Sequence, residues 1–309
     1  MENVKDNIYI IGSGAIGKAL AVCLKLDNKN VVLLRGSIDD KSTAIEKIQI
    51  SLDDRTELEA LIEVSTLSNF PELDGIVVLT NKSYGNEKLA KALKGKTNNS
   101  PVVILQNGLG VEQVFVDNDF PEVYRCVLFV TSQVISVNKI RFKPVSVCPI
   151  GRLKGNEANL ERVVDQLNSH GFRFSAELNI QAVIWKKAII NSVFNSICPL
   201  LDVDNGIFHR EEEALKIAKR VIEECVAISK EKGIFLNSDE VAASLLLISK
   251  ASDGQLISTL QDIKNRRETE IATLNFEIVR IAKGMNKGNL VMETELLGEL
   301  TRLKSDISR

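Results

Sequence analysis

The chain has 309 residues, with 39 basic and 41 acidic side chains and a formal net charge of −2. This length suits two domains of ordinary size, and the balanced charge argues against a nucleic-acid-binding surface or a polybasic membrane-binding surface. The five cysteines are odd in number and form no CxxC pair, which argues against a disulfide framework or a zinc site and favours a reducing compartment.

No stretch of the sequence predicts a targeting or membrane-spanning segment. The opening residues MENVKDN include acidic side chains, so we expect no signal peptide there. The most apolar helical stretch, 180–201, contains two lysines and several polar side chains, and no run reaches the roughly 20 apolar residues of a membrane helix. We therefore expect a cytoplasmic protein.

The first half of the chain alternates short apolar runs with helical patterns, which predicts a parallel sheet with crossover helices. The predicted strands are 7–11, 30–34, 75–79 and 101–105, and the predicted helices include 15–26 and 86–93. Two β-rich stretches (123–136 and 139–150), a helix (157–168) and a short strand (173–175) follow.

After about residue 176, long patterns with a 3.6-residue period replace the alternation. The predicted helices are 180–197, 210–232, 238–249, 269–283 and 292–305. We therefore predict an α/β Rossmann-type domain at residues 1–178 and an all-α domain at residues 179–309.

A GxGxxG motif lies between the first predicted strand and the first predicted helix. Its first glycine permits a tight turn, its second lets the backbone approach a pyrophosphate, and its third lets the helix pack closely on the strand. The helix then offers free N–H groups to phosphate. A merely tight turn is the alternative, but the order strand, turn, helix, strand favours dinucleotide binding. The expected cofactor-binding residues are Gly12, Ser13, Gly14, Ala15, Ile16 and Gly17.

The second predicted strand is followed by Arg35, at a position where NAD-binding domains usually have an acid. An acid would repel the 2′-phosphate of NADP, whereas a guanidinium can bind it with two hydrogen bonds. Arg35, helped by Ser37, therefore predicts NADP(H). The alternative is an exposed arginine in a loop. Asp39 and Asp40 weaken the local positive field, so the strictness of the preference for NADPH over NADH stays open.

Two further strand ends carry polar residues. Lys82 follows the strand at 75–79, and Asn107 follows the strand at 101–105. Ligands bind at the carboxyl ends of the strands of open α/β sheets, so both side chains are expected to face the cofactor. For the segment QNGLG, ordinary turn chemistry is the alternative.

The predicted helix at 180–197 carries a polar stripe. Lys187, Asn191 and Asn195 are spaced four residues apart among large apolar residues. Polar groups in a buried helix are costly without partners, so the stripe predicts a cleft that holds a polar ligand. A solvated helix face is the alternative. Lys186 lies about 100° around the helix and is expected to reach solvent.

The segment ISTLQDIKNRRETEI contains Ser258 and Glu270, which lie about 120° apart on an ideal helix and so would not share a stripe. The sequence alone predicts that Glu270 forms a surface salt bridge with Arg266 or Arg267. Neither histidine belongs to an HExxH motif, and no GxSxG elbow is present. Metal-dependent hydrolysis and an α/β-hydrolase are therefore disfavoured.

Taken together, these motifs resemble the ketopantoate reductase family (2-dehydropantoate 2-reductases) over nearly the whole chain. The matching segments are GSGAIG at 12–17, the basic residue after the second strand, TNK at 80–82, QNG at 106–108, WKKAIINSVFN at 185–195 and STLQDIKNRRETEI at 258–271. The resemblance implies an oxidoreductase that reduces the ketone of 2-dehydropantoate with NADPH, giving (R)-pantoate for pantothenate and coenzyme A synthesis.

The resemblance also implies roles for individual residues. Lys187 matches the catalytic lysine, and Glu270 matches the glutamate that supports it. Lys82 matches the lysine after the turn that follows the fourth strand, and Asn107 matches the asparagine between nicotinamide and substrate. The implied substrate-binding residues are Asn107, Asn191, Asn195, Asn205, Gln255 and Ser258.

Two features depart from the family pattern. Gln255 stands where such enzymes commonly have asparagine, and its longer side chain would crowd or shift a small substrate. The segment TSQVISVNKIRF, which begins at Thr131, lacks the expected glycines. The alternatives are therefore an NADPH-dependent reductase of another small 2-keto or 3-hydroxy acid, and a non-catalytic NADP-binding sensor. A homodimer and a monomer are both compatible with the sequence.

Overall fold

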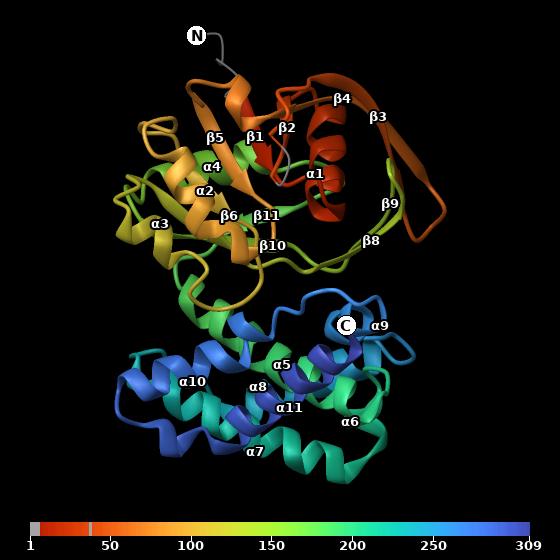
Figure 1. The fold of residues 1–309 in the computed structure, drawn as a ribbon, viewed down its shortest axis with the longest axis vertical. Helices are drawn as coiled ribbons and strands as arrows, with labels where there is room; N and C mark the ends of the chain where they lie inside the picture. The colour runs from red at the N-terminus through yellow and green to blue at the C-terminus, as the bar shows by residue number, and fades with distance from the viewer. Residues whose placement is uncertain (1–6, 37–38) are drawn as a thin grey trace. The chain divides into compact units, whose positions relative to one another are not determined.

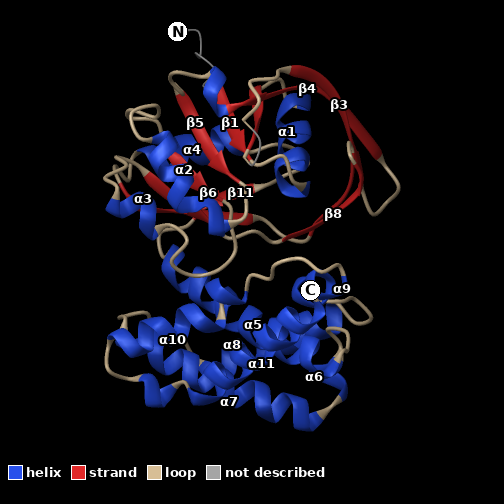
Figure 2. Cartoon of the chain, in the orientation of Figure 1, coloured by secondary structure: helices blue, strands red, loops and turns tan. Residues whose placement is uncertain are grey.

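The structure, a computed structural model, describes residues 7–36 and 39–309. The chain forms two compact units (Figures 1 and 2). The sheet unit comprises residues up to Asn107 and Val111–Ile180, and the helical unit comprises Gly108–Gly110 and Gln181–Arg309. In the described part of the chain, no helix combines the length and the apolar character needed to cross a membrane.

One large mixed sheet organises the sheet unit. Its spatial order is β11-β10-β7-β6-β5-β1-β2-β4-β3-β9-β8 among the described residues. The strands are β1 Asn7–Ile11, β2 Asn30–Arg35, β3 Ala44–Ser51, β4 Glu57–Thr66, β5 Gly75–Leu79, β6 Val102–Ile104, β7 Val123–Cys126, β8 Val130–Ser136, β9 Lys139–Pro144, β10 Cys148–Lys154 and β11 Phe174–Ala176.

Strand β1 lies between β2 and β5 and is parallel to both. β4 continues the sheet beyond β2 in parallel, and β6 and β7 continue it in parallel beyond β5. The chain therefore builds outward from β1 in one direction and then in the other. Open α/β sheets bind ligands at the carboxyl ends of the strands beside such a reversal, which here is the end of β1.

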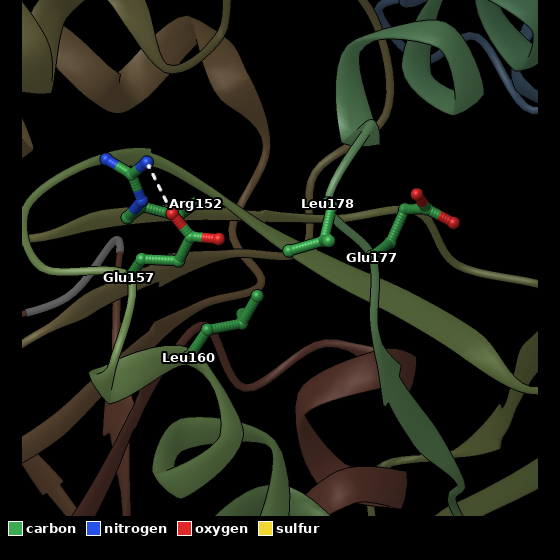
Figure 3. A pocket seen from close by; sticks show the side chains of 5 residues that line it. All are labelled: Arg152, Glu157, Leu160, Glu177 and Leu178. Atoms are coloured by element: carbon green, nitrogen blue, oxygen red, sulfur yellow. Dashed lines mark ion pairs between the residues drawn. The ribbon is translucent and has the colours of Figure 1, made fainter.

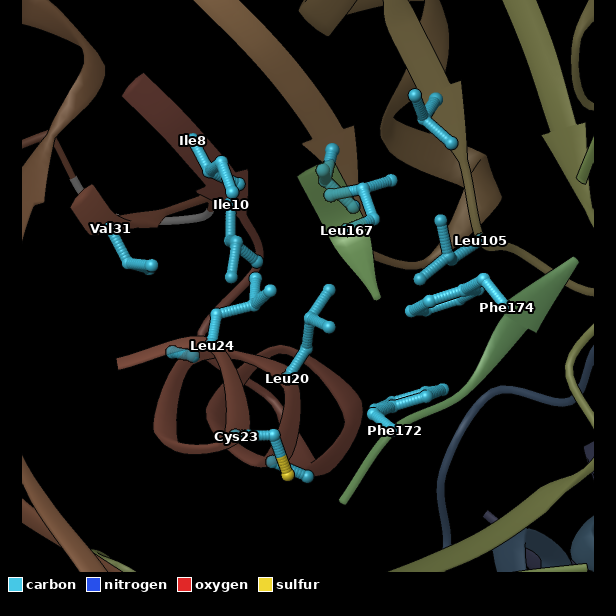
Figure 4. Packing of buried hydrophobic residues seen from close by; sticks show 14 of the residues in the cluster. Ile8, Ile10, Leu20, Cys23, Leu24, Val31, Leu105, Leu167, Phe172 and Phe174 are labelled. Carbon is cyan, nitrogen blue, oxygen red and sulfur yellow. The ribbon is translucent and has the colours of Figure 1, made fainter. Parts of the chain in front are cut away.

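Helices cover the two faces of the sheet because its central strands are apolar on both sides. Ile8 and Ile10 belong to one hydrophobic core, and Tyr9 and Ile11 belong to the other. Figure 4 shows the first core, where helix α1 (Ala15–Leu26) lies near the stacked rings of Phe172 and Phe174. The other helices of this unit are α2 Asn86–Leu93, α3 Gln113–Asp117 and α4 Asn159–Leu167.

The antiparallel pair β3–β4 is an addition that the sequence pattern did not predict. Its inner face is buried, with Ile48 and Ile50 fully inaccessible to solvent. Its outer face leaves Ile45 and Leu61 more than 60% exposed. Apolar residues therefore occur on both faces, which obscures the simple alternation that identifies a strand.

The helical unit consists of helices joined by short connections. They are α5 Ile180–Leu201, α6 Ile207–Arg210, α7 Glu212–Glu231, α8 Ser238–Ala251, α9 Ser258–Lys264, α10 Asn275–Gly284 and α11 Met292–Ser308. The first residue of α5, Ile180, belongs to the sheet unit. Helix α7 packs against α8, α10 and α11.

The predicted helix at 269–283 is wrong at its start. Helix α9 ends at Lys264, Arg266 has a positive φ of 55°, and α10 begins only at Asn275 after a 3₁₀ turn at Ile271–Thr273. The left-handed Arg266 keeps α9 from continuing, and the 3₁₀ turn then delays the start of α10 to Asn275. The angle of about 120° between Ser258 and Glu270 therefore has no meaning in the folded chain.

Candidate functional site

The turn after β1 requires glycine at two positions, because backbone atoms lie very close to them. The N–H of Gly12 donates to the carbonyl of Leu34 at 2.9 Å, and Gly12 has a φ of +122°. A Cβ atom at Gly12 would lie 2.6 Å from the backbone nitrogen of Asn81. A Cβ atom at Gly17 would lie 1.9 Å from the carbonyl oxygen of Gly12. Only glycine fits at these two positions.

Gly14 differs, because a Cβ atom there would meet no heavy atom within 4 Å. Gly14 precedes α1, whose first turn has no side-chain cap. The first N–H groups of a helix have no intrahelical acceptor, so this turn offers donors beside open space. A pyrophosphate group fits these features. The remaining turn residues predicted to bind the cofactor are Ser13, Ala15 and Ile16.

Thr80, which follows β5, locks this turn and was missed by the sequence analysis. Its hydroxyl donates to the carbonyl of Gly12 at 2.9 Å, and its N–H donates to the carbonyl of Ile11 at 2.9 Å. The only sequence signal was its place in the segment TNK. Lys82, two residues later, is exposed at the start of a 3₁₀ turn at Ser83–Gly85.

Arg35 ends β2 with a largely covered side chain that is only 18% exposed, so it is not an exposed loop arginine. Its Nη2 lies 3.4 Å from Asp40 and also donates to the carbonyl and the hydroxyl of Ser42. Its Nε is buried without a hydrogen-bond partner. The hydrogen bonds from Ser42, reinforced by Arg35, lower the pKa of Asp40. An unsatisfied guanidinium donor suits a phosphate oxygen. Ser37 lies outside the described residues.

Asn107 is exposed directly after a buried amide pair. Gln106 and Asn86 exchange two side-chain hydrogen bonds of 2.7 and 2.8 Å. Asn86 also donates to the carbonyl of Val111 at 2.8 Å. These bonds fix the chain on both sides of the segment 107–110.

A buried arginine binds the chain directly before Asn107. Arg125, in β7, is 2% exposed and donates to the carbonyl of Gln106 at 2.6 Å. Its Nε lies 3.3 Å from a carboxylate oxygen of Glu112. Burial lowers the pKa of Arg125, and the carboxylate of Glu112 opposes that effect. Sequence patterns did not identify Arg125, because a single arginine in a strand resembles any surface residue.

Residues Gly108–Gly110 belong to the helical unit. Gly108 and Gly110 have positive φ values of 94° and 68°, and a Cβ atom at Gly108 would collide with Thr273. The N–H of Leu109 donates to the carbonyl of Thr273 at 2.8 Å, and the N–H of Thr273 donates to the carbonyl of Glu270 at 3.1 Å. The turn after Asn107 is thus packed against the segment that carries Glu270.

Hydrogen bonds connect the polar stripe on α5 to the start of α9. The side-chain oxygen of Asn195 accepts from the hydroxyl of Ser258 and from the N–H of Thr259, both at 3.2 Å. The amide of Asn195 donates to the carbonyl of Asn191 at 3.0 Å. Asn195 is only 3% exposed, and Asn191 and Lys187 are half-buried. A fully solvated stripe is therefore excluded.

Asn205 and Gln255 also lie together. The N–H of Asn205 donates to the carbonyl of Gln255 at 2.9 Å, and the carbonyl of Asn205 accepts from the hydroxyl of Ser249 at 2.7 Å. The side-chain oxygen of Asn205 is buried without a hydrogen-bond partner, whereas Gln255 is exposed. An unsatisfied buried acceptor suits a ligand that donates a hydrogen bond.

Asp204 binds the residues next to Asn205 and Gln255 and so fixes both positions. One of its oxygens accepts from the N–H of Gly206 at 2.7 Å and from the N–H of Gly254 at 3.3 Å. Arg210 donates to Asp204 at 2.9 Å and also pairs with Asp253. The hydrogen bond from Gly206 is the main cause of the lowered pKa of Asp204. Asp204 and Arg210 therefore position the predicted substrate residues Asn205 and Gln255, and the sequence analysis did not identify this ion pair.

The predicted residues fall into two groups. The sheet unit carries the glycine turn, Arg35, Lys82 and Asn107, and the helical unit carries Lys187, Asn191, Asn195, Asn205, Gln255, Ser258 and Glu270. Within the helical unit, hydrogen bonds join Asn191, Asn195 and Ser258 into one cluster and Asn205 and Gln255 into another.

A small hollow in the sheet unit contains none of the predicted residues. Figure 3 shows its lining, which consists of Arg152, Glu157, Leu160, Glu177 and Leu178. Arg152 and Glu157 form an ion pair across 3.6 Å and so satisfy each other. We therefore assign no role to this hollow.

Comparisons with known proteins cover nearly the whole chain. Residues 8–154 match the family model described as ketopantoate reductase PanE/ApbA, and residues 179–297 match the model of its C-terminal domain. A curated relative from Pyrococcus abyssi, named 2-dehydropantoate 2-reductase, is 28% identical over 280 residues. That match covers 90% of this chain and 92% of the relative.

Solved structures share the fold. D-mandelate dehydrogenase in a ternary complex with NADH and anilino(oxo)acetate has a TM-score of 0.84 at 24% identity, covering 98% of this chain and 99% of that chain. A PanE/ApbA family ketopantoate reductase from Ralstonia eutropha has the same TM-score at 22% identity, with the same coverage of both chains.

Proposed function

Because the chain belongs to the ketopantoate reductase family, we propose that it reduces 2-dehydropantoate to (R)-pantoate with NADPH. The observation that carries this proposal is the cluster in which Asn195 binds Ser258 and Asn191. It provides a polar, half-buried surface on the same helix as Lys187. Such a surface suits a small hydroxy keto acid.

We propose NADP(H) as the cofactor. When bound, it supplies the hydride that reduces the keto carbon. Residues 12–17 would hold the pyrophosphate, and Arg35 would hold the 2′-phosphate. Lys82 and Asn107 would lie toward the nicotinamide end of the cofactor. The open space at Gly14 and the unsatisfied Nε of Arg35 support this assignment.

The chain's own residues supply positioning and a proton. The ammonium group of Lys187 donates a hydrogen bond to the keto oxygen and then transfers its proton as negative charge develops there. A cation placed at that oxygen stabilises the transition state more than the ground state. Glu270 orients Lys187. Asn191, Asn195 and Ser258 hold the carboxylate and the hydroxyl of the substrate, and Asn205, with its unsatisfied side-chain oxygen, accepts from that hydroxyl.

The test compares Lys187→Ala with Lys186→Ala, because the neighbouring lysine is also half-buried on α5. We expect Lys187→Ala to lower kcat by a factor of about 10² to 10⁴, since it removes general acid catalysis. NADPH affinity, measured by fluorescence titration, should stay the same, and Lys186→Ala should keep near-normal turnover. Unchanged turnover in the Lys187→Ala enzyme would refute the proposed role.

Gln255 favours a second candidate, the reduction of another small 2-keto acid. Its carbonyl binds the N–H of Asn205, so its exposed and longer side chain starts beside a predicted substrate residue. Following NADPH oxidation at 340 nm over a panel of 2-keto acids separates the candidates. Higher kcat/KM for 2-dehydropantoate supports the first, and higher kcat/KM for another acid supports the second. NADPH binding without any oxidation would indicate a sensor.

A further inference from the structure

The backbone carbonyl of Asn205 is bound by a serine of a different helix. The hydroxyl of Ser249, in α8, donates to this carbonyl at 2.7 Å, and Ser249 is fully buried. A serine in a helix can instead donate to the carbonyl four residues earlier. Ser244, in the middle of α8, and Ser252, at its end, both do so. Ser249 differs from these two serines, because its hydroxyl binds the segment that contains Asn205.

His209, in α6, contacts the same hydroxyl from its acceptor side. The backbone N–H and the Nδ1 atom of His209 each lie 3.3 Å from the Oγ atom of Ser249. A hydroxyl has one proton to donate and two lone pairs that can accept. A carbonyl can only accept, so the proton of Ser249 goes to Asn205 and its oxygen accepts from His209. The Nδ1 atom of His209 must therefore carry a hydrogen.

The second ring nitrogen of His209 faces a carboxylate. Its Nε2 atom lies 3.8 Å from Asp253, and Asp253 also pairs with Arg210. The side chain of His209 is only 20% exposed, so the ring is enclosed between Ser249 and Asp253. The two ring nitrogens thus have different partners, and Nδ1 is the one that contacts the serine.

These contacts fix the main chain of Asn205 on both sides. Its N–H donates to the carbonyl of Gln255 at 2.9 Å, and its own carbonyl accepts from Ser249. Its side-chain oxygen is buried without a hydrogen-bond partner, which leaves an acceptor for a ligand that donates. The direction of this acceptor depends on the position of the main chain and therefore on the bond from Ser249.

We propose that His209 and Ser249 are positioning residues that hold Asn205 in place for the hydroxyl group of the keto acid. The Nδ1–H group of His209 directs the hydroxyl of Ser249 to the carbonyl of Asn205, and the side-chain oxygen of Asn205 accepts from the substrate. The inference rests on the proposed function, which assigns this substrate contact to Asn205. His209 then determines, through Asn205, how strongly the enzyme prefers a hydroxylated keto acid.

Two substitutions of His209 separate the roles of its ring nitrogens. Asparagine carries its amide nitrogen near the position of Nδ1, whereas glutamine carries it near the position of Nε2. His209→Asn should therefore keep a donor to Ser249, and His209→Gln should lose that donor and turn its amide toward Asp253. His170→Gln is the matched control, because His170 is the other histidine of the sequence and its side chain is 96% exposed in the sheet unit.

The readout is the KM for two keto acids that differ by one hydroxyl group, 2-dehydropantoate and trimethylpyruvate. In His209→Gln, the KM for 2-dehydropantoate should rise about three- to tenfold, because one hydrogen bond to the substrate is weakened. The KM for trimethylpyruvate and both kcat values should stay the same. His209→Asn should restore most of the lost affinity, and His170→Gln should match the wild type. A general disturbance of the fold would instead raise both KM values alike.

Ser249→Ala tests the second positioning residue. It leaves the carbonyl of Asn205 without its donor and should cause the same selective loss for 2-dehydropantoate. Combining it with His209→Gln should add little, because both variants act through one hydrogen bond. Thermal unfolding of each variant checks that the helical unit remains folded.

The outcomes separate this inference from the proposed function. Equal changes in the two KM values, or additive losses in the double variant, would overturn the positioning role while the proposed function stands. A wild type that reduces neither keto acid would refute the proposed function and the inference with it. A selective rise in the KM for 2-dehydropantoate in His209→Gln and Ser249→Ala, with recovery in His209→Asn, would support both.

Discussion

The glycine turn of the sheet unit and the polar cluster of the helical unit, the two proposed binding regions, are built in opposite ways. The turn is built from backbone atoms. It requires glycine, because a Cβ atom at Gly12 or Gly17 would collide with the chain. The cluster is built from side chains, in which Asn195 joins helices whose first residues are 78 positions apart (Ile180 and Ser258). A backbone site is recognisable from sequence spacing, whereas a side-chain site requires the fold.

The largest expected effect comes from adding one methyl group to the glycine turn. Gly17→Ala places a Cβ atom 1.9 Å from a backbone oxygen, so both the melting temperature and NADPH affinity should fall sharply. Gly14→Ala meets nothing within 4 Å and should leave the melting temperature almost unchanged. It should still weaken NADPH binding about tenfold or more, because the methyl group occupies the path of the pyrophosphate.

Calorimetry and fluorescence titration of both variants measure these two effects separately. The comparison between the two glycines predicts that only one of them is needed for folding. If Gly14→Ala binds NADPH as tightly as the wild type, the pyrophosphate does not approach at this position.

The next effect concerns the side-chain cluster. Asn195→Ala leaves the buried N–H of Thr259 and the hydroxyl of Ser258 without their acceptor. Loss of such a partner costs about 1–3 kcal/mol, so the free energy of unfolding in urea should fall by that amount. The ratio kcat/KM for the keto acid should fall while NADPH affinity stays the same. Asn195→Asp keeps the acceptor and should retain more stability, and equal losses in both variants would contradict this explanation.

A more specific effect is expected at Arg35. Arg35→Ala should raise the KM for NADPH about ten- to hundredfold with little change for NADH, because a charge-assisted hydrogen bond is worth about 1.5–3 kcal/mol. Asp40 competes for the same guanidinium at 3.4 Å, so Asp40→Asn should improve the KM for NADPH slightly. Steady-state kinetics with both cofactors gives the answer. Equal losses for NADPH and NADH would refute binding of the 2′-phosphate.

The smallest effect is the pH dependence that Asp204 contributes. Its pKa is lowered in the folded state, so its contribution to stability is present above the unfolded pKa of about 4 and is lost as the pH falls through the folded pKa. The difference in unfolding free energy between wild type and Asp204→Asn should therefore be constant from pH 7 to pH 5. It should shrink below pH 4. A difference that grows with acid would contradict the sign of this shift.

Local patterns predicted the central strands of the sheet and the helix after the glycine turn, because each combines a strong period with turn residues at its ends. Strand β1 and helix α1 have the predicted bounds. The break between α9 and α10 was not predictable, since Arg266 adopts a left-handed conformation that no glycine or proline marks. Thr80 and Asp204 were missed because their partners are distant in the sequence or are backbone N–H groups.

Arg125 has a consequence for how the chain reaches its native state. A guanidinium that is 2% exposed has lost its water, and the hydrogen bond to the carbonyl of Gln106 and the ion pair with the carboxylate of Glu112 compensate for that loss only when both groups are in place. A folding intermediate with the loop after β6 misplaced would bury that charge without compensation. The position of Asn107, the next residue after Gln106, is therefore coupled to the burial of Arg125.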